Sequence, residues 1–211
     1  MAELSKDPDA RMLERMLLFS DAVFAIVLTL LAIELHAPEI EPGQTLWQAI
    51  AHMWSELFAF GFSFILIGLW WSVHMRSMRT IQRFDWPVAI ANLLVLACVT
   101  LLPFATSVFG VNPGNLDRLQ FYWWVSLAIS LSMILLFVVI HRGKGKLVGG
   151  ITPGYWWFRF TLGLAPAIAF ASGIYFCANG MEWPARYAAF IMFPVMLLAR
   201  MFNRKPKPQK A

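Results

Sequence analysis

The sequence of 211 residues is poor in charge and poor in cysteine, and both shortages narrow its class. Charged residues make up only 14% of the chain, whereas hydrophobic residues make up 59%. A water-soluble domain carries about 25% charged residues to cover its surface, so the composition indicates a membrane protein. The two cysteines, Cys98 and Cys177, lie inside apolar runs. They therefore suit packing rather than a disulfide framework or a metal site.

The chain also lacks the residue combinations on which common catalytic sites are built. It contains no His-Glu-x-x-His motif and no cluster of histidine with cysteine. Ser20, Asp21 and His74 form the only set that could imitate a catalytic triad. Ser20 and Asp21 are adjacent, so they diverge by about 100° on a helix and a Ser–His–Asp relay would be strained. The sequence therefore predicts a protein that is not an enzyme and that holds no cofactor or metal.

What the sequence has in quantity is long apolar runs. Six of them approach the roughly 20 residues that a helix needs to cross a bilayer. These runs are Met16–Leu35, Ile50–Val73, Trp86–Phe109, Leu119–Ile140, Tyr155–Ala178 and Trp183–Phe202. Tryptophans gather near their ends, where an amphipathic ring prefers the headgroup region. The predicted fold class is all-α, a polytopic membrane protein with six transmembrane helices per subunit.

The distribution of charge predicts the orientation of these helices. One side of the membrane receives nearly all the basic residues: Lys6, Arg11, Arg15, Arg76, Arg79, Arg83, Arg142, Lys144, Lys146, Arg200, Arg204, Lys205, Lys207 and Lys210. By the positive-inside rule, both termini of this multi-pass cell-membrane protein face the cytoplasm. We expect a cytoplasmic N-terminal segment (1–14), a six-helix transmembrane domain (15–203) and a basic cytoplasmic tail (204–211). Anionic lipid satisfies such a tail, so we expect no nucleic-acid partner.

The first predicted helix carries a serine, Ser20, and a carboxylate, Asp21, inside the membrane. An ionisable group there costs several kcal/mol unless a partner satisfies it, so its default interpretation is a functional site. His74 ends the second predicted helix and Asn92 lies six residues into the third, which places both in the same leaflet as Ser20 and Asp21. Ser20 or Asp21 could bond to His74, to Asn92 or to the indole of Trp71. We predict a network of side chains that holds the first helix at a fixed rotation. Its members are Arg15, Phe19, Ser20, Asp21, Trp71, His74 and Asn92.

The same helix also carries an apolar stripe. At about 100° per residue, Ile26, Leu30 and Ile33 fall within an arc of roughly 60°, and Thr29 flanks them. Taken alone, such a stripe is weak evidence for a pore, because most such stripes in membrane helices face lipid or pack against a neighbour.

These residues belong to a longer pattern. Arg15-x-x-x-Phe19-Ser20-Asp21, followed by Ala25, Ile26, Thr29, Leu30 and Leu31, resembles the first helix of the transmembrane protein 175 family. Trp71-x-x-His74, then Asp85, Asn92 and Leu101-Leu102-Pro103-Phe104-x-Thr106, resemble the second and third helices of that family, in the same order. Its members are potassium channels of endosomes and lysosomes and their bacterial relatives. Many carry a second histidine where this chain has Met75.

The resemblance implies a potassium-permeable channel without the Thr-Val-Gly-Tyr-Gly filter, which is also missing here. It implies that the first helix lines the pore and that the narrowest part consists of Ile26, Leu30 and Ile33, with Thr29 as the nearby hydroxyl. It also implies the bacterial single-repeat form, a homotetramer around the first helices. The permeant species would be potassium and other monovalent cations, and the partners would be the lipid bilayer and copies of the same chain.

Two other functions are open alternatives. A secondary transporter for a cation is one, although the sequence shows no inverted repeat and no matching broken segments in its second and fifth spans. A membrane scaffold without ion flux is the other. Reconstituted ion flux separates the three, because concentrative, saturable uptake favours the transporter and the lack of any flux favours the scaffold.

Overall fold

The computed structural model describes residues 8–112, 114–142 and 153–192, and all regular structure within these ranges is helical. Four stretches in them are long and apolar enough to cross a membrane: Pro8–Ile33, Trp54–Met78, Trp86–Val111 and Leu116–His141. They correspond to the first four predicted spans. The predicted class, an all-α protein with several membrane-spanning helices, is confirmed to that extent.

The first span, α1 (Pro8–Ile33), is longer at its start than predicted. The helix begins at Pro8 rather than Met16, so residues 8–14 of the expected N-terminal segment are helical. Proline suits a first helical position because its missing N–H would have no partner there. Asp9 in the first turn complements the positive end of the helix dipole.

The second span is displaced from its predicted position. In place of one helix from Ile50 there is a short α2 (Leu46–His52), followed after one residue by α3 (Trp54–Met78). Thr45 and Gln48 explain where α2 begins. The Gln48 N–H donates to Thr45 Oγ1, and the Thr45 N–H donates to Gln48 Oε1, which together form a capping box.

The third span lies where the sequence predicts it, but its helix has a local break that was not predicted. It consists of α4 (Trp86–Thr100) and α5 (Leu102–Val111), which are separated at Leu101. Pro103 provides the physical reason. It has no N–H to donate to the carbonyl of Val99, so the regular hydrogen-bond ladder is interrupted there.

The fourth span, α6 (Leu116–His141), and the fifth, α7 (Pro153–Ala178), agree closely with the prediction. The predicted sixth span, Trp183–Phe202, contains α8 (Glu182–Tyr187) and a short 3-10 helix, η1 (Ala188–Ile191). Its remaining part from residue 193 onward, and the predicted basic tail, lie outside the described residues.

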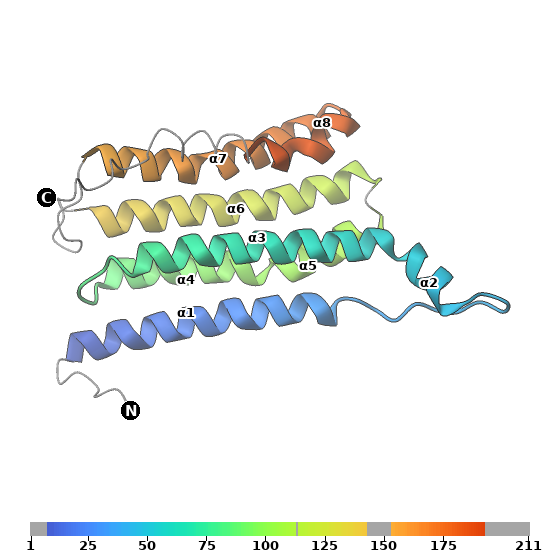
Figure 1. The fold of residues 1–211 in the computed structure, drawn as a ribbon. Coiled ribbons are helices and arrows are strands. Elements are labelled where there is room, and N and C mark those ends of the chain that lie inside the picture. The colour runs from blue at the N-terminus through green and yellow to red at the C-terminus, as the bar shows by residue number, and fades with distance from the viewer. Residues whose placement is uncertain (1–7, 113, 143–152, 193–211) are drawn as a thin grey trace, which may run out of the picture.

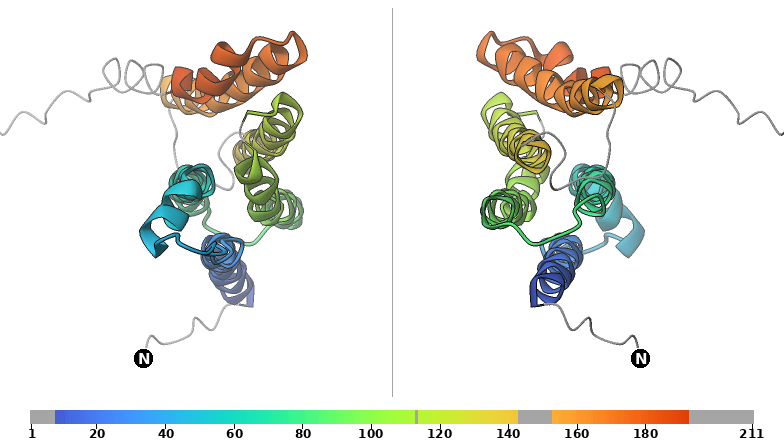
Figure 2. Two further views of the ribbon diagram at one scale, coloured as in Figure 1. Left: turned by 90° about the vertical axis from the view of Figure 1, so that its right-hand side faces the viewer. Right: turned by 90° about the vertical axis from the view of Figure 1, so that its left-hand side faces the viewer.

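The long helices lie side by side and run up and down along one direction (Figure 1). The start of α1, the α3–α4 turn and the end of α6 lie together at one end of the bundle. Seen along the helices, α1 stands at one edge of the bundle, and α7 with α8 forms the opposite edge (Figure 2).

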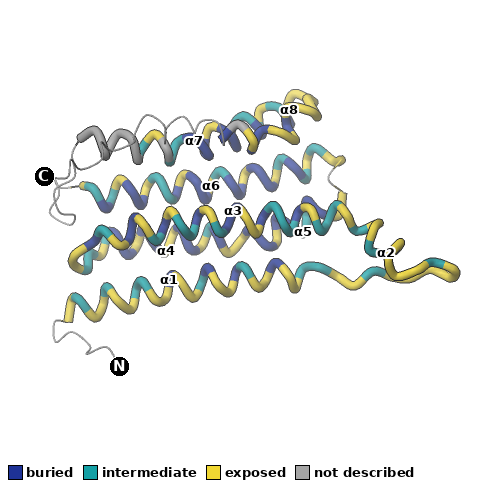
Figure 3. Tube along the Cα trace, in the orientation of Figure 1, coloured by how far each residue is buried: buried dark blue, intermediate teal, exposed yellow. Residues whose placement is uncertain are grey.

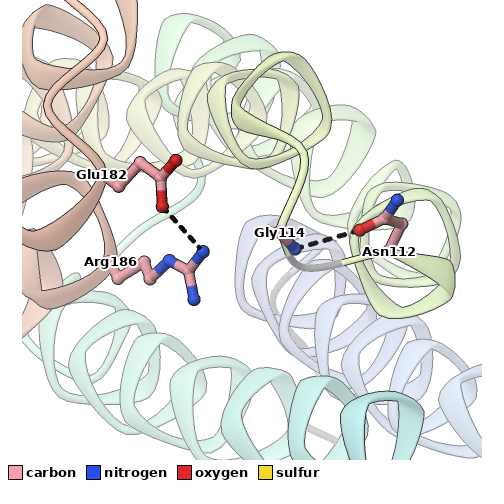
Figure 4. Close-up of polar contacts among 4 residues, drawn as sticks. All are labelled: Asn112, Gly114, Glu182 and Arg186. Atoms are coloured by element: carbon pink, nitrogen blue, oxygen red, sulfur yellow. Dashed lines mark hydrogen bonds and ion pairs between the residues drawn. The ribbon is translucent and has the colours of Figure 1, made fainter.

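The other end of the bundle carries α2, the α5–α6 turn and α8. The Gly114 N–H donates to Asn112 Oδ1 at 3.1 Å and closes the α5–α6 turn, while Arg186 and Glu182 form an ion pair at 3.3 Å (Figure 4). The two ends thus match the predicted division: arginines Arg79, Arg83 and Arg142 lie at the α1-start end, and acidic residues Asp117 and Glu182 lie at the other.

The edge of the bundle remote from α1 is packed around one buried indole. Trp123 of α6 stacks on Phe170 of α7 with ring centroids 5.5 Å apart, and its Nε1 donates to the carbonyl of Ala185 at 3.2 Å. Gly173 makes this approach possible, because a Cβ on it would lie 2.8 Å from Trp123 Cδ1. The indole therefore holds α6, α7 and α8 together.

Candidate pore helix and its polar junction

One face of α1 is buried and the opposite face is open. Phe24, Val27 and Leu31 are at most 1% exposed and form the contact with the rest of the bundle. Figure 3 shows the exposed side of α1 running along the outside of the subunit. One side of α1 is therefore fixed by packing within the subunit, and the other side is open to contact with lipid or with another protein chain.

The predicted apolar stripe lies on the open face. Ile26 is 55%, Leu30 37% and Ile33 71% exposed. Thr29 is exposed as well, and its Oγ1 donates to the carbonyl of Ile26 at 2.7 Å within the helix. Because that bond uses the hydroxyl proton, the oxygen of Thr29 remains available as an acceptor on the same face.

Asn92 of α4 lies at the centre of a junction between three helices. His74 Nε2 of α3 donates to Asn92 Oδ1 at 2.7 Å, and Asn92 Nδ2 donates to Ser20 Oγ of α1 at 2.9 Å. Ser20 Oγ in turn donates to the carbonyl of Met16 at 2.8 Å. Ser20, His74 and Asn92 are each 1% exposed. Burial makes each of these bonds costly to lose, because no solvent replaces it.

Asp21 has a separate partner. Trp71 Nε1 of α3 donates to Asp21 Oδ1 at 2.9 Å, and the carboxylate is on the exposed flank of α1. Of the partners that the sequence left open for Asp21, the structure places the indole there, whereas Asn92 bonds to Ser20. Trp71 and His74 are three residues apart, so neighbouring turns of α3 bond to α1 through Asp21 and to α4 through Asn92.

Two members of the predicted network stand apart from it. Phe19 is exposed on the open face of α1. Arg15 is also exposed, and it forms no hydrogen bond or ion pair within the described part of the chain. The structure therefore brings Ser20, Asp21, Trp71, His74 and Asn92 into contacts between helices, and it does not bring Arg15 or Phe19 into them.

Sequence reasoning missed a second buried polar cluster. Thr106 Oγ1 of α5 lies 2.8 Å from Ser63 Oγ of α3, which lies 2.9 Å from the hydroxyl of Tyr122 in α6. Thr106 Oγ1 also lies 2.8 Å from the carbonyl of Leu102. Two signals were available: Thr106 ends the motif that resembles the third helix of the family, and Ser63 is a serine in the middle of an apolar helix.

An ion pair joins two helices at the basic end of the bundle. Arg142 Nη2 donates to Asp85 Oδ2 at 2.6 Å, which links the end of α6 to the start of α4. Asp85 is also the N-cap residue of α4, although its side chain forms no capping bond. A partly exposed pair of this kind contributes about 0–1 kcal/mol.

These features define a class of protein: a polytopic helical membrane protein whose outermost helix is tied to its neighbours by polar side chains and opens an apolar face outward. In the ranges that the structure describes, no three His, Cys, Asp or Glu side chains gather as a metal site requires.

Comparison with known proteins finds a family match over the first part of the chain. Residues 15–103 match the model of the family described as the endosomal/lysosomal potassium channel TMEM175. This segment runs from within α1 to the start of α5 and includes every residue of the Asn92 junction and both partners of the Asp21–Trp71 bond. The resemblance predicted from the sequence is therefore confirmed.

Relatives and a solved structure agree with this match. A potassium channel of Streptomyces collinus is 36% identical over 90 residues, which cover 43% of this chain and 44% of the relative. The endosomal/lysosomal proton channel TMEM175 of Danio rerio is 25% identical over 130 residues, 60% of this chain and 25% of the relative. The chain thus spans less than half the length of either. These relatives are ion channels rather than enzymes, which agrees with the prediction that this chain is not an enzyme.

The fold has a solved counterpart. The crystal structure of a lysosomal potassium-selective channel TMEM175 homolog from Chamaesiphon minutus superposes with a TM-score of 0.73. The match covers 92% of this chain and 99% of the other, at 21% sequence identity. At that identity the likeness shows the fold, and the pore must be argued from the residues of this chain.

Proposed function

We propose that this chain forms a potassium-permeable cation channel whose pore is lined by α1. The observation that carries the proposal is the two-sided character of this helix. Its inner face is fixed by the buried hydrogen bond that Ser20 Oγ accepts from Asn92, while its outer face presents the exposed side chains of Ile26, Leu30 and Ile33. A helix held at one rotation with an open apolar face suits a pore built from side chains.

The pore requires several subunits. One helix cannot enclose a path, whereas four copies around an axis can, and cyclic symmetry is the usual way in which identical subunits close a ring. The position of α1 at the edge of the bundle supports this arrangement, because copies of α1 can meet there without rearrangement of the other helices (Figure 2). We propose a homotetramer with the α1 helices nearest the axis.

In such a ring, Ile26, Leu30 and Ile33 form successive apolar constrictions. An ion must shed part of its hydration shell to pass an apolar ring, and potassium holds its water less tightly than sodium. The constriction therefore favours potassium. The free acceptor side of Thr29 Oγ1 supplies an oxygen between the rings.

The proposed orientation follows from charge. The end of the bundle with Arg79, Arg83 and Arg142 faces the cytoplasm, so the start of α1 and the Asn92 junction lie in the inner leaflet. We propose residues 15–203 as the channel domain, with 1–14 and 204–211 on the cytoplasmic side. The partners are then the lipid bilayer, the three other subunits and monovalent cations.

The test is ion flux through the purified protein in lipid vesicles. Ile26→Asn and Leu30→Asn should hydrate the constriction and raise sodium flux relative to potassium flux, with assembly retained. A change of about 1 kcal/mol between the two barriers alters the flux ratio about fivefold. Parallel measurements with a large organic cation and with a proton gradient define the permeant ions.

The control variant is Leu131→Asn. Leu131 is an exposed leucine on α6, away from α1, so the same polar change there should leave the flux ratio alone. Val27 would be an unsuitable control because it is fully buried. Equal flux ratios in the Ile26, Leu30 and Leu131 variants would refute the pore assignment. Uptake against a gradient would instead support a transporter, and no flux from the unmodified protein would support a scaffold.

A further inference from the structure

The break in the third span has a local cause that the sequence shows and the backbone confirms. Pro103 cannot donate to the carbonyl of Val99, and the Leu101 N–H bonds to the carbonyl of Cys98, three residues back, at 3.2 Å. A tight turn of this kind replaces a regular α-helical turn between α4 and α5. Breaks of this sort are where a long helix bends.

The depth of the break matches the depth of the proposed constriction. The Ser20–Asn92 hydrogen bond sets α1 and α4 level with each other, and both helices run in the same direction (Figure 1). Nine residues further along, Thr29 and Leu101 both lie about 14 Å from that bond, at 1.5 Å per residue. The break is therefore level with the stripe Ile26–Ile33.

The two halves of the span are held by different partners. On the inner side of the break, Asn92 joins α4 to α1 and α3. On the outer side, Thr106 joins α5 to Ser63 of α3, which bonds to Tyr122 of α6. No bond among the residues that the structure describes ties α5 to α1 through a side chain, so the outer half of α1 rests on α5 by apolar packing.

The outer half also has room to move. A cavity of about 160 Å³ lies between the outer parts of α1, α3 and α5. Leu31, Glu34 and Leu35 line it from α1 and the residues just beyond it, and Thr106 and Val111 line it from α5. Close-packed helices resist small displacements, and an open volume of this size removes that resistance on one side.

We infer that the Leu101–Pro103 break is a hinge that gates the constriction. When α5 bends against α4, the outer half of α1 moves into or out of the cavity beside it, while the inner half stays fixed at Ser20. The apolar rings at Leu30 and Ile33 then widen or narrow. This inference rests on the proposed channel function and adds to it the element that opens the pore.

Single-channel recording in planar bilayers tests the hinge. Pro103→Ala restores the missing N–H and should straighten the span, which we expect to change the ratio of open to closed times about tenfold. The control is Pro87→Ala. Pro87 lies in the first turn of α4, where an N–H has no helical partner, so the open ratio should stay as in the unmodified protein. Equal open ratios in the two variants would overturn the hinge.

A reversible cross-link across the cavity provides a second test that does not depend on Pro103. Leu35→Cys and Val111→Cys are combined in a chain with Cys98→Ala and Cys177→Ala. Oxidation should fix the outer half of α1 to α5 and abolish the transitions between open and closed states, and reductant should restore them. Either single cysteine alone should be insensitive to oxidant.

The outcomes also separate the hinge from the channel. If the unmodified protein passes no cation, the proposed function is wrong and the hinge falls with it. If the protein conducts, and cross-linked channels still open and close as before, the hinge alone is refuted.

Discussion

The Asn92 junction makes a prediction whose magnitude follows from its geometry. Asn92→Ala removes two buried bonds of 2.7 and 2.9 Å and leaves His74 Nε2 and Ser20 Oγ with one fewer partner each. Hydrogen bonds between membrane helices contribute about 0.6 kcal/mol on average and up to about 1.7 kcal/mol each. The free energy of unfolding should therefore fall by about 1–3 kcal/mol.

The assay is equilibrium unfolding in mixed detergent micelles, arranged as a double-mutant cycle with Ser20→Ala. The cycle isolates the Asn92–Ser20 bond from the packing that is lost when either side chain is shortened. We expect a coupling energy of about 0.6–1.7 kcal/mol, between the average and the largest value for such bonds. Ser20→Ala alone should cost less than Asn92→Ala, because Ser20 gives up one interhelical bond and Asn92 two.

Asn179→Ala is the matched control. Asn179 is exposed, and its amide donates to the carbonyl of Tyr175 four residues back, so its loss should leave the free energy of unfolding nearly unchanged. Additivity of the Asn92 and Ser20 variants within about 0.3–0.5 kcal/mol would refute the junction as an energetic link between α1 and α4.

Two further changes address the other polar contacts. Asp21→Asn keeps an oxygen that accepts from the Trp71 indole, so this variant should retain cation flux. Asp21→Ala and Trp71→Phe both remove the bond and should reduce flux or tetramer yield. Normal flux in the Ala and Phe variants would contradict this role. Tyr122→Phe removes the hydroxyl beside Ser63, which still has Thr106 as a partner, so unfolding should become easier by only about 1 kcal/mol. A loss well above that value, measured in the same micelles, would mean that the ring has shifted.

The sequence predicted that polar side chains of the first three spans lie at one depth in the membrane, but not how they pair. Depth along each span was enough to bring Ser20, Asp21, His74 and Asn92 to one leaflet. The choice between Ser20 and Asp21 depends on the 100° between adjacent residues and on which side of α1 faces the bundle. Phe24, Val27 and Leu31 decide that side, and their burial was visible only in the folded chain.

Helix ends were harder to predict than helix positions. Hydrophobicity predicts the third span, but it does not report the effect on the backbone of Pro103, which lies within a run of apolar residues. The start of α3 was misplaced because apolar residues continue from α2 through Met53, so composition alone gave no boundary. Local hydrogen bonding, which hydrophobicity does not report, sets both ends.

Sequence similarity to the family is recognisable in the first half of the chain, whereas the structural similarity extends over most of it. The family match ends at residue 103, whereas the structural match covers 92% of the chain. Directional bonds such as those of Asn92 require particular side chains, while apolar packing tolerates exchanges that preserve volume. Helices α6 and α7, packed by apolar and aromatic side chains such as Trp123, therefore keep the fold without leaving a recognisable motif.

The buried indole of Trp123 also has an optical consequence. Trp123 and Trp70 are enclosed by the helices, whereas Trp47, Trp86 and Trp183 lie exposed near the ends of the spans. A quencher attached to lipid headgroups should therefore dim the emission of the exposed tryptophans and leave a blue-shifted component from the enclosed ones. Intrinsic tryptophan fluorescence of the unlabelled protein would therefore report whether the α6–α7 side of the bundle stays closed during the proposed movement of α1.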